Sequence, residues 1–238
     1  MPVYYFWGDD EFRLKKAVDA LRDRTLDPAW ANFNYDRIAP ESAEAPMQAL
    51  NQAMTPPFGM GKRFVLLANT TLGQRCSEEV MTELSRTLPI VPETAVLLLT
   101  STNKPDGRLK STKLLKQYAE IKEFASIAPW QTDQIISQVK RVAQEAGLQL
   151  KPQSAMLLAD AVGSDTRRLY NELEKLSLYW SHQGNVKTEP LPPEIVTRLV
   201  TVSTQTSFQL SEALIAGKTA QALSLASDLL ANNEHALR

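Results

Sequence analysis

Short runs of consecutive apolar residues alternate with helical patterns through the first half of the chain. Such a run is typical of a strand that is buried on both faces of a sheet. Strands are predicted at residues 3–7, 33–38, 64–68, 95–100 and 121–124. Helices, in which apolar residues recur every three or four positions, are predicted after the first strand and at residues 43–53, 77–88 and 114–118. Strands that alternate with helices predict an α/β domain whose parallel sheet is covered on both faces.

The second half of the chain carries helical patterns without strands. Helices are predicted at residues 130–146, 155–162, 166–180 and 194–200. The first three are long enough to form a small bundle. A polar segment rich in Pro and Gly, residues 181–193, is predicted to be a loop.

The last part of the chain predicts the beginning of another helical domain. A polar, weakly patterned segment at residues 201–207 is typical of a linker. A helical hairpin is predicted after it, at residues 208–216 and 220–231, with a break at Gly217. The apolar face of this hairpin has no later segment to pack against. We therefore expect that the chain is cut inside a third domain.

Composition and charge narrow the class of protein. Of the 238 residues, 43% are hydrophobic and 22% are charged, and the formal net charge is −1. This balance argues against coating nucleic acid by bulk charge, but it allows a local basic patch. Cys76 is the single cysteine, and His182 and His235 are far apart, which argues against a disulfide framework or a metal centre. A cytoplasmic protein without a membrane span is expected. Trp7 and Trp130 are expected in the core, and Cys76 is expected to be inert.

A loop rich in Pro and Gly precedes the third predicted strand. Residues 54–63 read Met-Thr-Pro-Pro-Phe-Gly-Met-Gly-Lys-Arg. Two Pro and two Gly forbid a regular helix or strand, so the apolar side chains of this segment lie on a loop. These apolar residues are Met54, Pro57, Phe58 and Met60. Because loops run over the surface, Phe58 either packs under its own domain or is offered to a partner. The residues of the loop leave both interpretations open.

The turn after the first strand has the layout of a nucleotide phosphate site without its chemistry. A phosphate loop needs G-x-x-x-x-G-K-[ST]. Residues 8–15 read Gly-Asp-Asp-Glu-Phe-Arg-Leu-Lys, so Arg13 and Leu14 replace the second Gly and the Lys. The three acids would repel a triphosphate, and the third strand runs into Ala-Asn-Thr at residues 68–70 instead of acids that hold Mg²⁺. Arg63 follows Gly61-Lys62 where Ser or Thr is needed. We predict no ATP hydrolysis, no cofactor and no metal.

One segment of this nearly neutral chain is rich in Lys and Arg. This cationic cluster comprises Lys104, Arg108, Lys110, Lys113 and Lys116. These side chains could contact DNA phosphates. A solvated helix face is the simpler interpretation and the favoured one.

Three stretches together resemble the delta subunits of the bacterial DNA polymerase III clamp loader. They are residues 5–12, the Pro57-Phe58-Gly59 loop before residues 62–65, and residues 163–176. The similarity runs from about Val3 to the end of the chain. It implies an AAA+-like α/β domain with a degenerate phosphate loop, a helical lid, and the start of an all-helical collar that is cut short. The implied boundaries are residues 1–127, 128–203 and 204–238.

The resemblance also implies a function. Delta subunits open the sliding clamp by inserting two apolar residues, commonly Leu-Phe, from the loop before the third strand. Phe58 fits this pattern and Pro57 departs from it, and Met54 and Met60 complete the expected clamp-binding set. Implied partners are the beta sliding clamp, the gamma/tau and delta-prime subunits in a hetero-pentamer, and primed DNA. The chain would not be catalytic alone. The alternative is a diverged AAA+ ATPase or a nucleotide-binding adaptor.

Overall fold

The computed structural model describes residues 2–40, 42, 44–183, 189–200, 214–215, 217–220, 222–223 and 226–227. The chain divides into two compact units, Met1–Ser126 and Ile127–Arg238. Almost all of the linker and third domain predicted after residue 200 lies outside the described residues. Among the residues that are described, no helix is long and apolar enough to cross a membrane.

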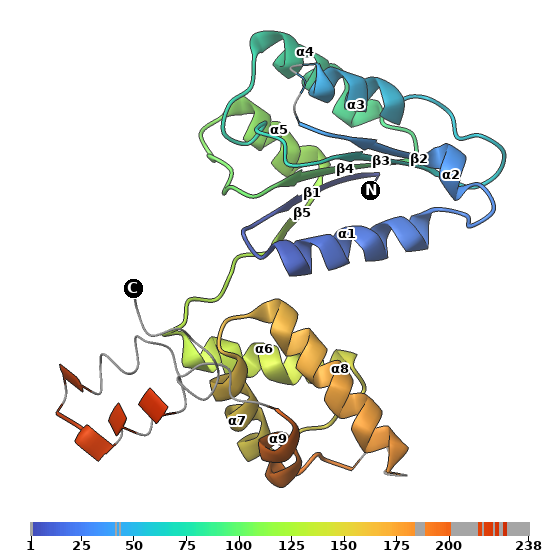
Figure 1. Cartoon of the computed structure of the whole chain (residues 1–238). Helices are drawn as coiled ribbons and strands as arrows, with labels where there is room; N and C mark the ends of the chain where they lie inside the picture. The colour runs from blue at the N-terminus through green and yellow to red at the C-terminus, as the bar shows by residue number, and fades with distance from the viewer. Residues whose placement is uncertain are drawn as a thin grey trace. The chain divides into compact units, whose positions relative to one another are not determined.

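The first unit contains a five-stranded sheet in which every pair of neighbours is parallel (Figure 1). The strands are β1 Val3–Trp7, β2 Tyr35–Ile38, β3 Arg63–Leu67, β4 Ala95–Ser101 and β5 Glu120–Glu123. Their order across the sheet is β2-β3-β4-β1-β5. The parallel α/β sheet predicted from the alternation of strands and helices is therefore confirmed.

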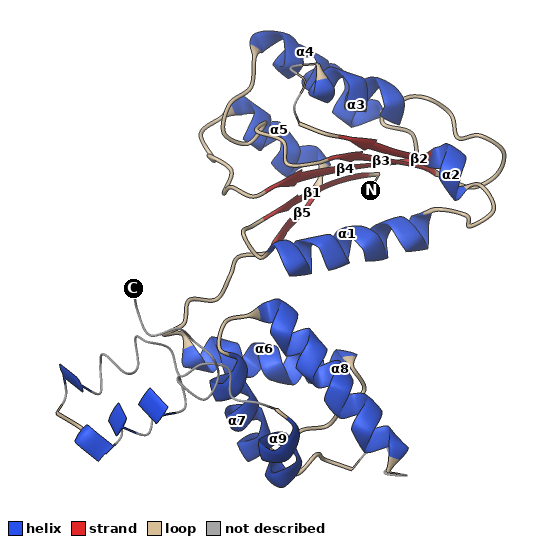
Figure 2. Ribbon diagram, in the orientation of Figure 1, coloured by secondary structure: helices blue, strands red, loops and turns tan. Residues whose placement is uncertain are grey.

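Helices cover both faces of this sheet (Figures 1 and 2). One face is covered by α1 Glu11–Thr25, and the other by α3 Ala45–Ala53, α4 Glu78–Thr87 and α5 Lys110–Tyr118. A short 3₁₀ helix, η1 Leu88–Ile90, follows α4. Alternate residues of β4 belong to the two opposite cores, with Leu97 and Leu99 in one and Leu98 in the other. This central strand is buried along its whole length, which explains its unbroken apolar sequence.

The second strand is shorter than predicted. The sequence predicts a strand at residues 33–38, but β2 begins at Tyr35 and is preceded by the short helix α2 Ala31–Asn34. The Trp30 carbonyl accepts hydrogen bonds from the backbone N–H groups of Phe33 and Asn34, at 3.0 and 3.2 Å, which closes this turn. As a result the Phe33 ring is 62% exposed, whereas Asn34 is buried.

The second unit is helical, as predicted, and packs around its own core. Its helices are α6 Thr132–Glu145, α7 Pro152–Val162, α8 Thr166–His182 and α9 Pro193–Leu199. Asp165 caps α8 by accepting a hydrogen bond from the Arg168 N–H at 2.9 Å. One expectation is wrong, because Trp130 is 83% exposed. It precedes the first residue of α6, so the apolar stripe of that helix does not include it. Trp7 does pack against the core of the sheet.

Candidate functional site

The loop of residues 54–62, called here the Pro/Gly loop, connects α3 to β3. Phe58 lies near its middle with 59% of its side chain exposed, and Met60 is 75% exposed. Met54 is exposed as well, whereas Pro57 is half-buried. The structure therefore brings the four predicted residues together on one loop, with three of them open to solvent. Their role in clamp binding stays a prediction.

The backbone of Phe58 is held by one buried side chain. The Asn34 amide donates a hydrogen bond to the Phe58 carbonyl at 3.0 Å and accepts one from the Phe58 N–H at 2.7 Å. Asn34 itself is 1% exposed, so its orientation is set by the packing around it. A single amide thus satisfies both polar backbone groups of Phe58. The exposed Phe58 ring therefore extends from a backbone whose conformation is held by two hydrogen bonds.

Arg63 holds the same loop from its other end. Its guanidinium donates to the Asp36 carboxylate at 2.9 Å and to the Gln52 side-chain oxygen at 3.1 Å. A third hydrogen bond reaches the Pro56 carbonyl, at 3.3 Å. Arg63 therefore links strand β2, helix α3 and the Pro/Gly loop through its planar fork of donors. In the sequence, Arg63 was considered because it follows Gly61-Lys62 at the position where a phosphate loop needs Ser or Thr.

Three aromatic rings meet at this loop and form what we call the aromatic patch: Trp30, Phe33 and Phe58. The Phe58 ring lies 5.5 Å from Trp30 and 5.4 Å from Phe33, measured between ring centroids. Gly59, at φ +66°, allows the close approach, since a Cβ there would lie 2.8 Å from the Trp30 ring. Phe58 thus contacts its own domain on one side and stays open on the other.

Sequence reasoning missed Trp30, Phe33 and Asn34 as parts of this site. These residues precede Phe58 by 24 positions or more, and no local pattern connects them to the loop. Phe33 was assigned to a strand, where its side chain would have been expected to pack on the sheet. A run of two aromatics and two amides within residues 30–34 was the one signal available.

Replacing Asn34 by Ala is expected to lower the free energy of unfolding by about 1–2 kcal/mol, because the Phe58 carbonyl and N–H both lose their partner. Urea unfolding of the purified chain measures this change. Asn32→Ala is the matched control, since Asn32 lies exposed on the same short helix and should change stability by less than about 0.5 kcal/mol. Equal losses in the two variants would contradict the anchoring role of Asn34.

The turn between β1 and α1 is occupied by the chain's own carboxylates. Asp10 caps α1 by accepting a hydrogen bond from the Arg13 N–H at 3.0 Å, and it is buried beside the Arg13 guanidinium. The Asp10 N–H donates to the Phe124 carbonyl at 2.9 Å. A nucleotide phosphate would need this helix N-terminus for itself. The Asp10 carboxylate takes that place.

Asp9 is also engaged within the chain. Its carboxylate accepts a hydrogen bond from the Ser126 N–H at 2.7 Å. That bond holds the pKa of Asp9 below its usual value. Asp9 and Asp10, two of the three acids that follow Gly8, therefore serve the fold of this turn.

The end of β3 lacks the acids of a metal-assisted nucleotide site. Asn69 stands there in a left-handed conformation, at φ +47°. Its side-chain oxygen accepts a hydrogen bond from the Thr102 hydroxyl at 3.2 Å, and its N–H donates to the Thr100 hydroxyl at 3.0 Å. These bonds join the ends of β3 and β4. Within the described part of the chain, no cluster of three or more His, Cys, Asp or Glu side chains is placed to hold a metal ion.

The cationic cluster lies on the loop after β4 and on helix α5. All five of its side chains are exposed: Lys104, Arg108, Lys110, Lys113 and Lys116. Arg108 is paired with Asp106 at 2.7 Å. Hydrogen bonds from the Arg108 side chain and backbone lower the pKa of Asp106 to about 2. Asp106 therefore stays charged at neutral pH and offsets one of the five cations. The contact with DNA stays a prediction.

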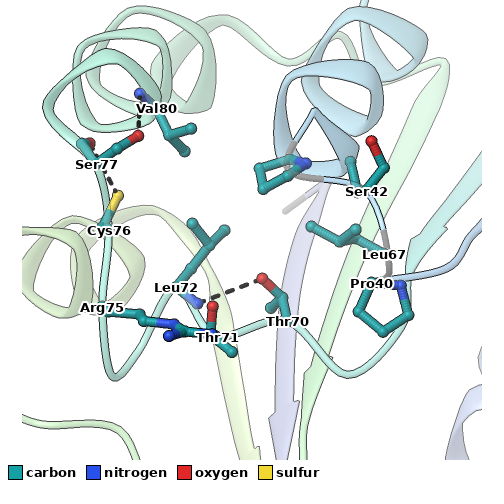
Figure 3. Close-up of a pocket in the computed structure, with 12 residues that line it drawn as sticks. Pro40, Ser42, Leu67, Thr70, Thr71, Leu72, Arg75, Cys76, Ser77 and Val80 are labelled. Carbon is teal, nitrogen blue, oxygen red and sulfur yellow. Dashed lines mark hydrogen bonds between the residues drawn. The ribbon is translucent and has the colours of Figure 1, made fainter.

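A cavity of 560 Å³ opens where β3 ends, between the first turns of α3 and α4 (Figure 3). Leu67, Thr70, Arg75 and Cys76 are among the residues that line it. Burial raises the pKa of the Cys76 thiol, so that it stays protonated at neutral pH. This agrees with the expectation that Cys76 is inert.

The fold and the turn after β1 define an α/β module with a parallel sheet, in which the Asp10 carboxylate lies at the helix N-terminus where a phosphate would bind. Comparison with known proteins agrees with this class and narrows it. The chain belongs to the DNA polymerase III delta subunit family, whose model matches residues 4–125. The resemblance found from the three sequence stretches is thereby confirmed.

A curated sequence and a solved structure from Bacillus subtilis illustrate the similarity. The DNA polymerase III subunit delta of strain 168 is 24% identical over 244 residues, which cover 100% of this chain and 68% of the relative. The solved structure of the B. subtilis DNA clamp loader delta protein superimposes with a TM-score of 0.80 at 24% identity. That superposition covers 99% of this chain and 69% of the solved chain, and it shows the shared fold.

Proposed function

We propose that the chain acts as a clamp-loader delta subunit that binds and opens the beta sliding clamp through the Pro/Gly loop. The observation that carries this proposal is the contrast at Phe58, whose ring is 59% exposed while both its backbone polar groups are bonded to Asn34. Membership of the delta subunit family supports the choice of partner.

An aromatic ring on a fixed backbone is suited to act as a binding anchor. Association requires loops to become ordered, and a loop that is already held by Asn34 and Arg63 has less freedom to lose. Aromatic side chains in central, dry pockets dominate the energy of many protein interfaces. Burying the exposed part of the Phe58 ring is worth about 1–2 kcal/mol by apolar area alone. The same ring, inserted as a wedge, could hold a clamp interface open.

The neighbours of Phe58 extend the proposed contact. Met60 and Met54 are exposed on the same loop, and their unbranched side chains adapt to irregular apolar surfaces. Pro57 is half-buried and stands where the family commonly has Leu. We assign Pro57 the role of restricting the backbone beside Phe58. Its direct contribution to the contact would then be small.

The chain is proposed to work without nucleotide chemistry of its own. Its family is that of an accessory subunit of a polymerase. The Asp10 carboxylate at the start of α1 supports this, because a phosphate would have to displace it against charge repulsion. A diverged ATPase is the competing function, and it requires that turn to open.

The remaining partners and domains follow from the same proposal. We assign residues 1–127 to the AAA+-like domain, 128–203 to a helical lid and 204–238 to the first helices of a collar. Assembly with gamma/tau and delta-prime subunits, and contact with primed DNA, would take place in the complete loader. The candidates for the DNA contact are Lys104, Arg108, Lys110 and Lys113, on the loop after β4 and on α5.

The deciding experiment is an isothermal calorimetric titration of the purified chain against the beta sliding clamp of the same organism. We expect a dissociation constant below about 1 µM, which corresponds to roughly −8 kcal/mol. A parallel titration with ATP is expected to give no binding. A folded chain that binds ATP and not the clamp would overturn the proposal in favour of the diverged ATPase.

A further inference from the structure

Phe33 is a second exposed aromatic ring beside the proposed anchor. It lies on α2, and 62% of its side chain is exposed, which is close to the value for Phe58. The centroids of the two rings are 5.4 Å apart, and their planes make an angle of 37°. Trp30 contacts both, at 5.5 Å from Phe58 and 6.4 Å from Phe33. The aromatic patch therefore presents two open rings on a shared Trp base.

The backbone of Phe33 is also held by a hydrogen bond. Its N–H donates to the Trp30 carbonyl at 3.0 Å, which holds it in the turn of α2. The residue that follows is Asn34, the buried amide that binds the Phe58 backbone. One structural unit thus sets the spacing of both rings before any partner arrives.

We infer that Phe33 is a second anchor of the clamp contact, so that the contact surface is a pair of rings from two separate segments. The inference rests on the proposed function. A stable protein interface covers about 800 Å² on each partner. A partner seated on Phe58 therefore also covers a ring whose centroid is 5.4 Å away. The matching surface on the clamp would be an apolar groove wide enough for two rings.

Phe33 could instead serve only to support Phe58 from within the domain. The two roles differ in what happens when Phe58 is altered. A supporting residue loses its effect on binding when the residue that it supports has been changed. A residue that touches the partner keeps an effect of its own, which a double-mutant cycle measures.

The test compares the clamp dissociation constants of the wild type, Phe33→Ala, Phe58→Ala and the double variant. Phe58→Ala removes the ring that Phe33 would support, and a tenfold loss from a dissociation constant below about 1 µM stays measurable. We expect Phe33→Ala to weaken binding by about fivefold or more in both backgrounds. Ile90→Ala is the control, because Ile90 is exposed on η1 outside the aromatic patch and should change binding by less than about twofold.

The outcomes separate this inference from the proposed function. If Phe58→Ala weakens binding strongly and Phe33→Ala changes it by less than about twofold, Phe33 is not an anchor and the proposed function stands. An effect of Phe33→Ala that disappears in the Phe58→Ala background likewise overturns the direct contact. If neither Phe58→Ala nor Phe33→Ala changes the affinity, the proposed function itself fails. Circular dichroism melting of each variant checks that an exposed-ring truncation has left the fold unchanged.

Discussion

Phe58→Ala is expected to weaken binding of the beta sliding clamp by more than about tenfold while leaving the fold intact. Truncation removes the exposed ring and the apolar area that it would bury in the clamp. The fold should tolerate this, because 59% of the side chain faces solvent and the Asn34 hydrogen bonds involve only the backbone of residue 58. The loss therefore falls on binding and not on folding.

Calorimetric titration of the variant against the clamp measures the effect, with Ile90→Ala as the exposed apolar control. The proposed contact is apolar. The ratio of the dissociation constants of Phe58→Ala and the wild type should therefore change little between low and high salt. Unchanged affinity in a folded Phe58→Ala chain would remove this loop from the clamp contact. A loss that vanishes at high salt would instead point to charged side chains as the main contact.

Gly8→Ala is expected to lower the free energy of unfolding of the first unit by at least about 3 kcal/mol. Gly8 has φ +146°, and a Cβ there would lie 2.1 Å from the Phe124 carbonyl oxygen. Phe124 has no room to yield, because its N–H donates to the Trp7 carbonyl at 2.7 Å and its carbonyl accepts from the Asp10 N–H at 2.9 Å. The substitution forces two bonded backbone segments apart.

Substitutions at two other glycines distinguish the effect of the steric clash from the effect of a positive φ. Gly163→Ala keeps a positive φ, +60°, with nothing within 4 Å of the new Cβ, and it should lose only about 1 kcal/mol. Gly107→Ala meets only the end of the Lys116 side chain at 3.7 Å, and it should stay within about 0.5 kcal/mol of the wild type. Urea unfolding followed by circular dichroism compares the three. A Gly8→Ala chain of wild-type stability would show that this turn can open, as a phosphate loop must.

Most helices and strands of the fold could be predicted from the pattern of apolar residues. An unbroken apolar run predicted β4, and the helical pattern at residues 77–88 predicted α4, which Ser77 caps by accepting a hydrogen bond from the Val80 N–H. Both depend on local chemistry, the burial of consecutive residues in one case and a side chain bonded to a nearby N–H in the other. The errors came where distant contacts decide. Phe33 lies in α2 and not in the predicted strand, and Trp130 is exposed and not in the predicted core.

The candidate site divides in the same way. The loop, the position of Phe58 on it and the loss of phosphate-binding residues after Gly8 could be predicted from composition and motif. The sheet order, the pairing of Asn34 with the Phe58 backbone and the contact between the Phe33 and Phe58 rings could not. These features join segments 24 or more positions apart, and a sequence pattern records only neighbours along the chain.

The pattern of residues along the chain was therefore enough to predict a parallel α/β domain followed by helices, with an apolar loop before β3. Hydrophobic periodicity and turn chemistry are local properties, and they suffice for those conclusions. The direction that Phe58 faces, and the contacts that hold it, follow from packing in the folded chain. That outcome depends on a buried amide and a Trp ring that the fold brings to the loop from another segment.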